Sequence, residues 1–502
     1  MKNKKTIKMS LLGIVVIFLA TACSGDFLEI EVPGNLSLDK FYLTDDDAMQ
    51  ATIAMYDMQM EGSSYFSWYL IKTLPSDESN TSGSGSGDQP ALQDMDIFNW
   101  DSNNDAIRGY WNRTYQVINR ANLVIEKVEP ENDLRKRLIA EAKSLRAYYY
   151  LDLVSQWGGV PIILSVLSID EFQTQTRASV EDVYAQIEKD LTEAITDLPL
   201  KSQYSQADKF RVSKGTAQAI LGKAYLYQEK WDEAVDVLEE VYNSLEYSLE
   251  PRFASIFTEE KEFGIESLLE ISYTTQKTNY PGGRARKSNN LIQLMGIKAG
   301  IYQKAPGDSL VGGGWAFNSP KAILYDAFIN ASDEVRRIET LMSVEELRAK
   351  GGDWTNPNFW GYEGFLRRKY GSYSTETFDG TSVVNWGTNW RLIRYADVLL
   401  MLSEAYYRMG GNEDNARFML NKVRERAELE DITVSGEALF EAIVTERRLE
   451  LALEGHRYPD LIRWGRAAEV LAPYGFTPGV HELLPIPDTD VRSGGLDQNP
   501  GY

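Results

Sequence analysis

The feature that most restricts the fold of this chain is a spacing of small and large residues that recurs in pairs of predicted helices. Between residues 212 and 242, two consecutive amphipathic stretches carry small and large side chains on one face. Small residues let two helices cross closely and large ones fill the space between them, as in tetratricopeptide repeats. The residues concerned are Ala217, Leu221, Gly222, Ala224, Tyr225, Trp231 and Ala234, and Ser213 is placed to cap the first helix.

Two further copies of this spacing occur elsewhere in the chain. One runs from Leu402 through Tyr406 to Ala416, and a looser one runs from Leu145 to Tyr149. Further helices are predicted over residues 45–60, 108–128, 180–196 and 437–453, whereas strand-like stretches such as 267–273 are few and short. We therefore predict a mostly α fold, a tetratricopeptide-like helical repeat scaffold with few short strands.

The repeats are separated by a long segment of different composition. From about residue 250 to 390 the chain is rich in Gly, Asn, Tyr and Trp and shows weak periodicity. Loops of that length inside a compact protein are usually functional. We predict a loop-rich insertion at 251–392 that binds a ligand, between helical parts at 23–250 and 393–502. A Ser/Gly run at 81–87 predicts a further flexible loop.

The first 23 residues have the order of a secretory signal. Four lysines are followed by an apolar run from Leu11 to Leu19, then by small residues and Cys23. The run is too short to span a membrane, which takes about 20 residues. A Cys directly after small residues matches a bacterial lipobox, although Leu19 lies one place further from the Cys than is usual. We expect a signal peptide at 1–22 and a lipid anchor on Cys23, with the protein on the outer membrane, facing the cell exterior.

Charge and composition exclude several classes of partner. The net charge is −22, so a phosphate backbone would be repelled and nucleic acid is not an expected partner. The same charge disfavours anionic polysaccharides and leaves neutral sugars unaffected. A single Cys cannot close an internal disulfide, and only two His are present, so no Cys/His zinc site is expected. We expect no cofactor and no metal; calcium held by carboxylates alone stays open as an alternative, although no twelve-residue loop is spaced for it.

The tryptophans divide into two groups. Four belong to predicted helices or their ends, where packing explains them, and seven lie mainly in irregular segments. A sugar ring has an apolar face that stacks on an indole, while its hydroxyls need polar groups at the edges. The irregular-segment tryptophans have Asn and Asp neighbours, which favours carbohydrate binding by two or more of them, although each one singly is as well explained by packing under its own loop. The seven are Trp68, Trp100, Trp315, Trp354, Trp360, Trp386 and Trp390.

Several segments, in order along nearly the whole chain, resemble the SusD/RagB family of Bacteroidetes nutrient-binding lipoproteins. The early ones are Cys23 to Leu28, Arg120 to Asn122, Glu141 to Tyr148, Trp157 to Pro161 and Val183 to Pro199. The later ones are Arg394 to Ala405, Asn421 to Ala427, Glu446 to Gly455, Arg457 to Trp464, Leu484 to Pro487 and Gln498 to Tyr502.

The resemblance implies a right-handed stack of tetratricopeptide-like units with a looped subdomain. It also implies a non-enzymatic role, in which the protein binds oligosaccharides and delivers them to a partner SusC-like TonB-dependent transporter. Family ligands lie on loops outside the repeats, so position alone maps the expected site onto an early loop and the insertion. The expected glycan-binding residues are Asp77, Trp100, Asn104, Tyr302, Trp315, Trp354 and Trp360.

Two other classes of function remain open from the residues. Tetratricopeptide repeats usually bind partners, which supports a peptide- or protein-binding scaffold. A surface glycoside hydrolase would need two opposed acids among the aromatic loops, where Asp94, Asp96 and Asp101 are the nearest candidates. Carboxylates one turn apart on a helix do not face a bond from opposite sides, so ion pairing is the interpretation for Glu446, Glu450 and Glu454. The histidines, His456 and His481, lack a neighbouring nucleophile motif.

Overall fold

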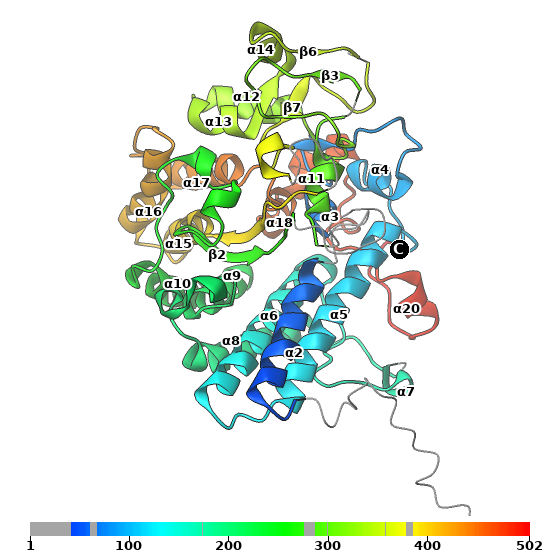
Figure 1. Ribbon diagram of the computed structural model, residues 1–502, viewed down its shortest axis with the longest axis vertical. Coiled ribbons are helices and arrows are strands. Elements are labelled where there is room, and N and C mark those ends of the chain that lie inside the picture. The colour runs from blue at the N-terminus through cyan, green and yellow to red at the C-terminus, as the bar shows by residue number, and fades with distance from the viewer. Residues whose placement is uncertain are drawn as a thin grey trace, which may run out of the picture. The chain divides into compact units, whose positions relative to one another are not determined.

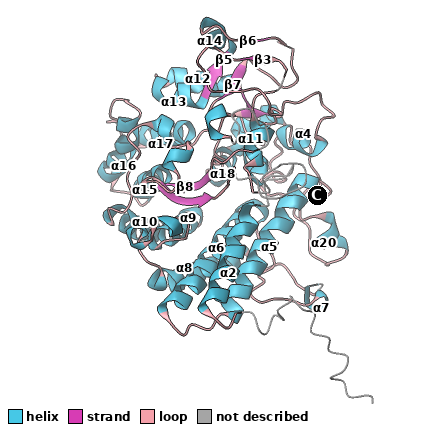
Figure 2. Cartoon of the chain, in the orientation of Figure 1, coloured by secondary structure: helices cyan, strands magenta, loops and turns pink. Residues whose placement is uncertain are grey.

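The computed structural model describes residues 42–60, 68–172, 174–275, 287–298, 300–356, 358–377 and 385–502. Cys23 and the predicted signal peptide lie outside the described residues. Residues 48–502 form one compact unit, and residues 1–47 are grouped separately. Within residues 48–502 the fold is mostly helical with short strands, as predicted (Figure 2).

Long helices that pack in sequence form the repeat scaffold. In Figure 1, α5 (Asp105–Lys127), α6 (Asp133–Trp157) and α8 (Val180–Asp197) lie at the bottom. To their left and above follow α9 (Lys214–Tyr227), α10 (Trp231–Asn243), α15 (Tyr395–Arg408), α16 (Glu413–Arg426) and α17 (Glu437–Glu450). Helix α10 packs on α15, so helices separated by 150 residues of chain continue one stack. The insertion therefore leaves the scaffold and returns to it.

The helix pair α9–α10 shows why the spacing predicted this fold. A Cβ atom at Gly222 would lie 2.4 Å from the side chain of Leu238, so only glycine permits this crossing without a shift. Ser213 caps α9 as predicted, because its hydroxyl accepts the Thr216 N–H at 3.4 Å.

The other predicted helices are present with small changes at their ends. Helix α2 spans Asp45–Met60, and α5 begins three residues earlier than predicted because Asn104 caps it. Helix α17 ends at Glu450 instead of residue 453, and Leu453 has a positive φ of 58° that a helix does not allow.

The insertion and the early loops contain short elements. Above the scaffold in Figure 1 lie α12 (Ala322–Asn330), α13 (Glu334–Thr340), α14 (Val344–Ala349), β3 (Tyr302–Gln303), β6 (Asp353–Trp354) and β7 (Phe365–Arg367). The remaining strands are β1 (Ser79–Asn80), β2 (Ser267–Ile271), β4 (Ser319–Pro320), β5 (Leu341–Ser343) and β8 (Trp390–Arg394). The remaining helices are α3 (Trp68–Thr73), α4 (Pro90–Asp96), α7 (Ile169–Phe172), α11 (Asn290–Met295), α18 (Arg457–Arg463), α19 (Ala467–Leu471) and α20 (Asp488–Arg492).

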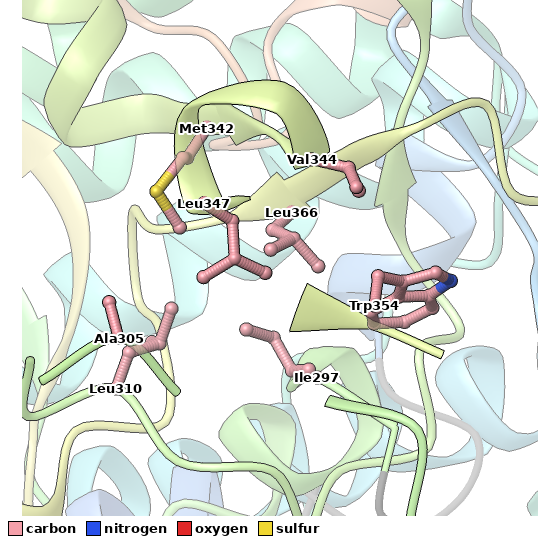
Figure 3. Packing of buried hydrophobic residues seen from close by; sticks show 8 residues of the cluster. All are labelled: Ile297, Ala305, Leu310, Met342, Val344, Leu347, Trp354 and Leu366. Carbon is pink, nitrogen blue, oxygen red and sulfur yellow. The ribbon is translucent and has the colours of Figure 1, made fainter. Parts of the chain in front are cut away.

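The strands within the described residues form four antiparallel pairs, β1–β4, β2–β8, β3–β6 and β5–β7. The insertion has a hydrophobic core of its own, shown in Figure 3, to which Leu310, Met342, Leu347, Trp354 and Leu366 contribute. Burial of these apolar side chains holds the loops in place, since the paired strands are only two to five residues long.

A buried network of ions joins the insertion to the repeats. Arg394, at the end of β8, lies 2.6 Å from Glu266, 2.9 Å from Glu450 and 2.7 Å from Glu454. Burial alone would raise the pKa of Glu450, but the surrounding cations, Arg426 foremost, outweigh it and lower that pKa. Glu446, Glu450 and Glu454 therefore form ion pairs, as predicted. Their partners, however, are buried and distant in sequence, whereas the prediction placed them on the surface of the same helix.

The carboxyl of Glu262, near β8, predicts that the stability of the fold depends on pH. Burial raises the pKa of Glu262 to about 8, although the Arg391 cation opposes the shift. Between about pH 4.5 and 8 the folded chain keeps this proton and the unfolded chain loses it, so stability falls as pH rises. Glu262→Gln is expected to add about 1–2 kcal/mol of unfolding free energy at pH 8.5 and little at pH 5. Thermal unfolding of both proteins across this range is the measurement, and an equal difference at every pH would contradict the assignment.

No helix among the described residues is long and apolar enough to cross a membrane.

Candidate functional site

The early loop and the insertion, the two segments to which the expected site was assigned, lie against each other. Strand β1 pairs with β4, with Asn80 opposite Ser319. Beyond this pair, the Ser82 N–H donates to the Ala316 carbonyl at 3.1 Å, and the Ser82 hydroxyl donates to the Gly361 carbonyl at 2.9 Å. Three segments that are far apart in sequence therefore meet, and we call the surface that they share the loop surface (residues 80–93, Lys298 with 312–317, and 358–361).

Trp360 is the most open tryptophan of the loop surface. Its side chain is 47% exposed, and its indole Nε1 donates to the Gln93 side-chain oxygen at 3.0 Å. Gln93 in turn donates to the carbonyls of Ser82 and Asp88 at 3.3 and 3.2 Å. The hydrogen bond fixes the indole at its edge while a large share of its surface stays in contact with solvent. An exposed aromatic held in this way is suited to stack against an apolar ligand face.

Further aromatic and polar groups lie on the three segments of the loop surface. The ammonium of Lys298 lies 5.9 Å from the centre of the Phe359 ring and 3.3 Å from the Ser84 hydroxyl. Trp315 is half-buried and packs edge-on against the buried Phe317, with ring centres 6.1 Å apart. The loop surface thus combines flat apolar faces with hydroxyl, amide and ammonium groups.

Two glycines permit the close approach of the loops. Gly361 has a φ of +63°, and a Cβ there would lie 2.7 Å from the Thr81 carbonyl oxygen. Gly83, in the predicted Ser/Gly loop, has a φ of +140°, and a Cβ there would lie 3.0 Å from the Phe317 ring. Both positions combine a conformation that favours glycine with a lack of space.

Asp77, expected to contact ligand, has a structural role instead. Its side chain is buried and lies 2.8 Å from Arg457 and 3.0 Å from Arg448. Burial would raise its pKa, but the hydrogen bond from Arg457 and the charge of Arg448 hold it below its usual value. Because its oxygens are engaged by these cations, Asp77 anchors the early loop to the C-terminal helices.

Trp100 and Asn104 are also turned into the structure. Trp100 is 4% exposed, and its Nε1 donates to the Tyr502 hydroxyl at 2.8 Å. Asn104 is the N-cap of α5, with its side-chain oxygen 2.9 Å from the Ala106 N–H. The predicted helix began at residue 108, four positions further on, so the sequence prediction did not show this cap.

The two remaining residues, Trp354 and Tyr302, belong to the core of the insertion. Trp354 is 2% exposed and stacks on Tyr362 with ring centres 4.3 Å apart. Tyr302 is half-buried opposite Trp354 in the β3–β6 pair and packs on the same core. Of the seven expected residues, Trp315 and Trp360 thus lie on the loop surface with part of their rings open. Trp386 and Trp390 are buried as well.

Sequence reasoning missed Gln93, Lys298 and Phe359. Gln93 lies on α4 and meets Trp360 from 267 positions away, a contact that a single sequence does not indicate. Phe359 stood between two predicted tryptophans, so its position next to Trp360 was an available signal.

Comparison with known families decides the relationship. A family described as "SusD family" matches residues 205–476, more than half of the chain. A second family, described as "Starch-binding associating with outer membrane", matches residues 33–226. The chain belongs to the SusD family. The resemblance noted from the motifs is thereby confirmed. Neither matching description names an enzyme, and the second associates this SusD-family chain with the outer membrane.

Similar proteins and solved structures agree with this placement. SusD-like protein P38 of Formosa agariphila is 26% identical over 94% of this chain and 94% of its own length. A laminarin binding SusD-like protein is 34% identical, with a TM-score of 0.82 over 91% of this chain and 99% of its own. Surface glycan-binding protein A from Bacteroides thetaiotaomicron, in complex with laminarihexaose, is 25% identical, with a TM-score of 0.77 over 91% of this chain and 99% of its own.

The carboxylates considered for hydrolysis have structural partners in this SusD-family fold. Asp96 accepts the Thr81 N–H at 2.7 Å and lies 3.5 Å from Lys321. Asp94 accepts from Asn99 at 3.2 Å, and Asp101 accepts the Asn103 N–H at 2.8 Å. These contacts stabilise the loops that carry the three carboxylates.

Proposed function

We propose that this protein binds neutral oligosaccharides at the cell surface and delivers them to a partner SusC-like TonB-dependent transporter, without catalysing a reaction. The observation that carries the proposal is the loop surface, where Trp360 and Trp315 present indole surface beside polar groups. Sugar rings stack on such faces, and their hydroxyls are bound by fixed donors and acceptors at the edge.

A β-glucan of the laminarin type is the ligand class we favour. Support comes from the SusD-like relative named for laminarin binding, which matches this chain at 34% identity over nearly its full length. The net charge of −22 is also compatible with an uncharged glucan.

Delivery requires the protein to stay at the membrane. Cys23 follows a signal-like segment, and we propose that a lipid on this residue tethers the protein to the outer membrane, facing the exterior. Replacing Cys23 by Ser is expected to release the protein from the membrane fraction, which fractionation of cells tests.

Binding is tested with the detergent-solubilised full chain by affinity electrophoresis in gels containing laminarin, and by calorimetry with laminarihexaose. We expect retarded migration in laminarin and saturable heat with the hexasaccharide, and no reducing ends released on incubation. The proposal fails if neutral polysaccharides leave migration unchanged. Binding of peptides in that case would favour the scaffold function, and release of sugar would favour a hydrolase.

A further inference from the structure

A cavity of about 220 Å³ lies in the insertion, away from the loop surface. It is lined by the segment around Phe257, by Ser309, by the end of α13 at Glu339 and by residues 368–376, and it is partly open to solvent. None of its lining residues belongs to the Trp360 environment described above.

The size of the cavity suits one six-membered ring. An engineered cavity of about 150 Å³ with apolar walls stays dry and holds a benzene molecule. The present cavity is larger, and its walls are partly polar, so a ring that carries hydroxyl groups fits better than a hydrocarbon. Pockets for longer ligands are usually above about 300 Å³, so the volume favours a single sugar unit over an oligosaccharide.

The walls offer hydrogen-bonding groups with spare capacity. The Arg368 guanidinium makes one long contact, 3.4 Å from Nη1 to Asp308, so its Nη atoms keep further hydrogens that can be donated. No ion pair or hydrogen bond of the Glu339 carboxylate is found among the described residues, although its charge acts on Arg368. The Arg368 guanidinium can donate hydrogen bonds and the Glu339 carboxylate can accept them, and adjacent hydroxyls of a sugar ring need both kinds of partner.

Aromatic side chains complete the lining. Phe257 packs edge-on against Tyr370 at 5.0 Å between ring centres, and Tyr373 adds a half-buried ring whose hydroxyl donates to the Arg368 carbonyl at 3.1 Å. Glu376 lies in the same wall and accepts the Thr388 hydroxyl. Burial raises the pKa of Glu376 to about 7, so near neutral pH this carboxyl is in part a donor as well as an acceptor.

The core of the insertion separates this cavity from the loop surface. The backbones of Tyr373 and Leu310 form an isolated β-bridge. Leu310 lies on one side of the core in Figure 3, whereas Trp354 lies on the other side and packs against Phe359. A ligand in the cavity and a chain on the loop surface therefore contact different groups.

We propose that the cavity lined by Phe257, Glu339, Arg368 and Tyr373 is a second binding site that takes a single neutral pyranose. The inference rests on the proposed function in taking sugars as the ligand class, and it assigns a site that the loop surface does not include.

The test uses the full chain in detergent and D-glucose as the probe, followed by saturation-transfer NMR and titration. Thr375→Phe is designed to fill the cavity, because Thr375 lines it and is exposed, so a larger side chain is tolerated. Glu339→Leu removes the free acceptor. Each variant is expected to weaken glucose binding at least tenfold, while laminarihexaose binding stays within twofold of the unsubstituted protein.

The matched control is the double substitution of Trp315 and Trp360 by Ala, which alters the loop surface alone. It is expected to retain glucose binding and to lose the hexasaccharide. Absence of glucose binding in the unsubstituted protein, or glucose binding that survives Thr375→Phe and is lost in the tryptophan variant, overturns the inference. Failure of the proposed function shows separately, as a lack of hexasaccharide binding by the unsubstituted protein.

Discussion

Replacing Trp315 and Trp360 together by Ala is expected to weaken laminarihexaose binding at least about 30-fold. A few aromatic side chains of a binding surface usually cost about 2 kcal/mol or more when truncated, and a loss of about 2 kcal/mol for the pair together corresponds to about 30-fold in affinity. Trp360 is 47% exposed and Trp315 half-buried, so removal of the two rings leaves the core nearly intact. Calorimetry with the hexasaccharide measures the loss, and the melting temperature is expected to change little.

Trp354→Ala is the informative comparison. The same residue type lies six positions from Trp360, yet it is 2% exposed and belongs to the core of the insertion. Its replacement is expected to cost about 3–5 kcal/mol of unfolding free energy through the cavity left behind. If the double variant instead melts far below the unsubstituted protein, Trp315 and Trp360 are packing residues and the loop surface is not a binding site.

Replacing Arg394 by Met is expected to destabilise the fold by about 3–5 kcal/mol. Arg394 is buried and neutralises carboxylates from three places, Glu266, Glu450 and Glu454. Methionine fills much of the volume but leaves those carboxylates without one of their cations, and an uncompensated buried charge is costly. Denaturant unfolding measures the change, and a reduced yield of folded protein is a second readout.

The control for Arg394 is Arg348→Met. Arg348 forms an ion pair with Asp353 at 2.9 Å, but both side chains are largely exposed. Exposed pairs contribute little because water screens them, so the melting temperature is expected to stay the same. Equal effects of the two substitutions would show that the buried network does not carry the stability assigned to it.

The scaffold was predictable because its signals are local. A helix face repeats every three to four residues, and Gly222 and Ser213 act within one repeat, so a single sequence contains the whole signal. The boundaries of α2 and α8 followed from the same periodicity, and the family motifs supported the assignment over nearly the whole chain.

The meeting of the early loop with the insertion followed the sequence prediction, whereas the burial of the individual residues did not. Asp77 and Asn104 look like ligand-binding groups in sequence, because nothing nearby shows that Arg457 and a helix N-terminus already occupy them. Likewise Trp354 and Trp360 have similar neighbours in sequence but opposite burial in the fold. Trp354 lies in the two-residue strand β6 and packs into the insertion core, whereas Trp360 lies in a turn beyond it, and a weakly periodic segment does not show where so short a strand ends.

The close approach of Gly361 to the Thr81 carbonyl means that the insertion and the early loop of this protein cannot be changed independently. A side chain at position 361 would strike the backbone of the early segment, so the two segments must change in concert. A chimera that borrows residues 298–363 from a relative therefore needs that relative's residues 79–96 as well. If only one segment were exchanged, the loop surface would combine residues from two proteins whose backbones do not fit each other.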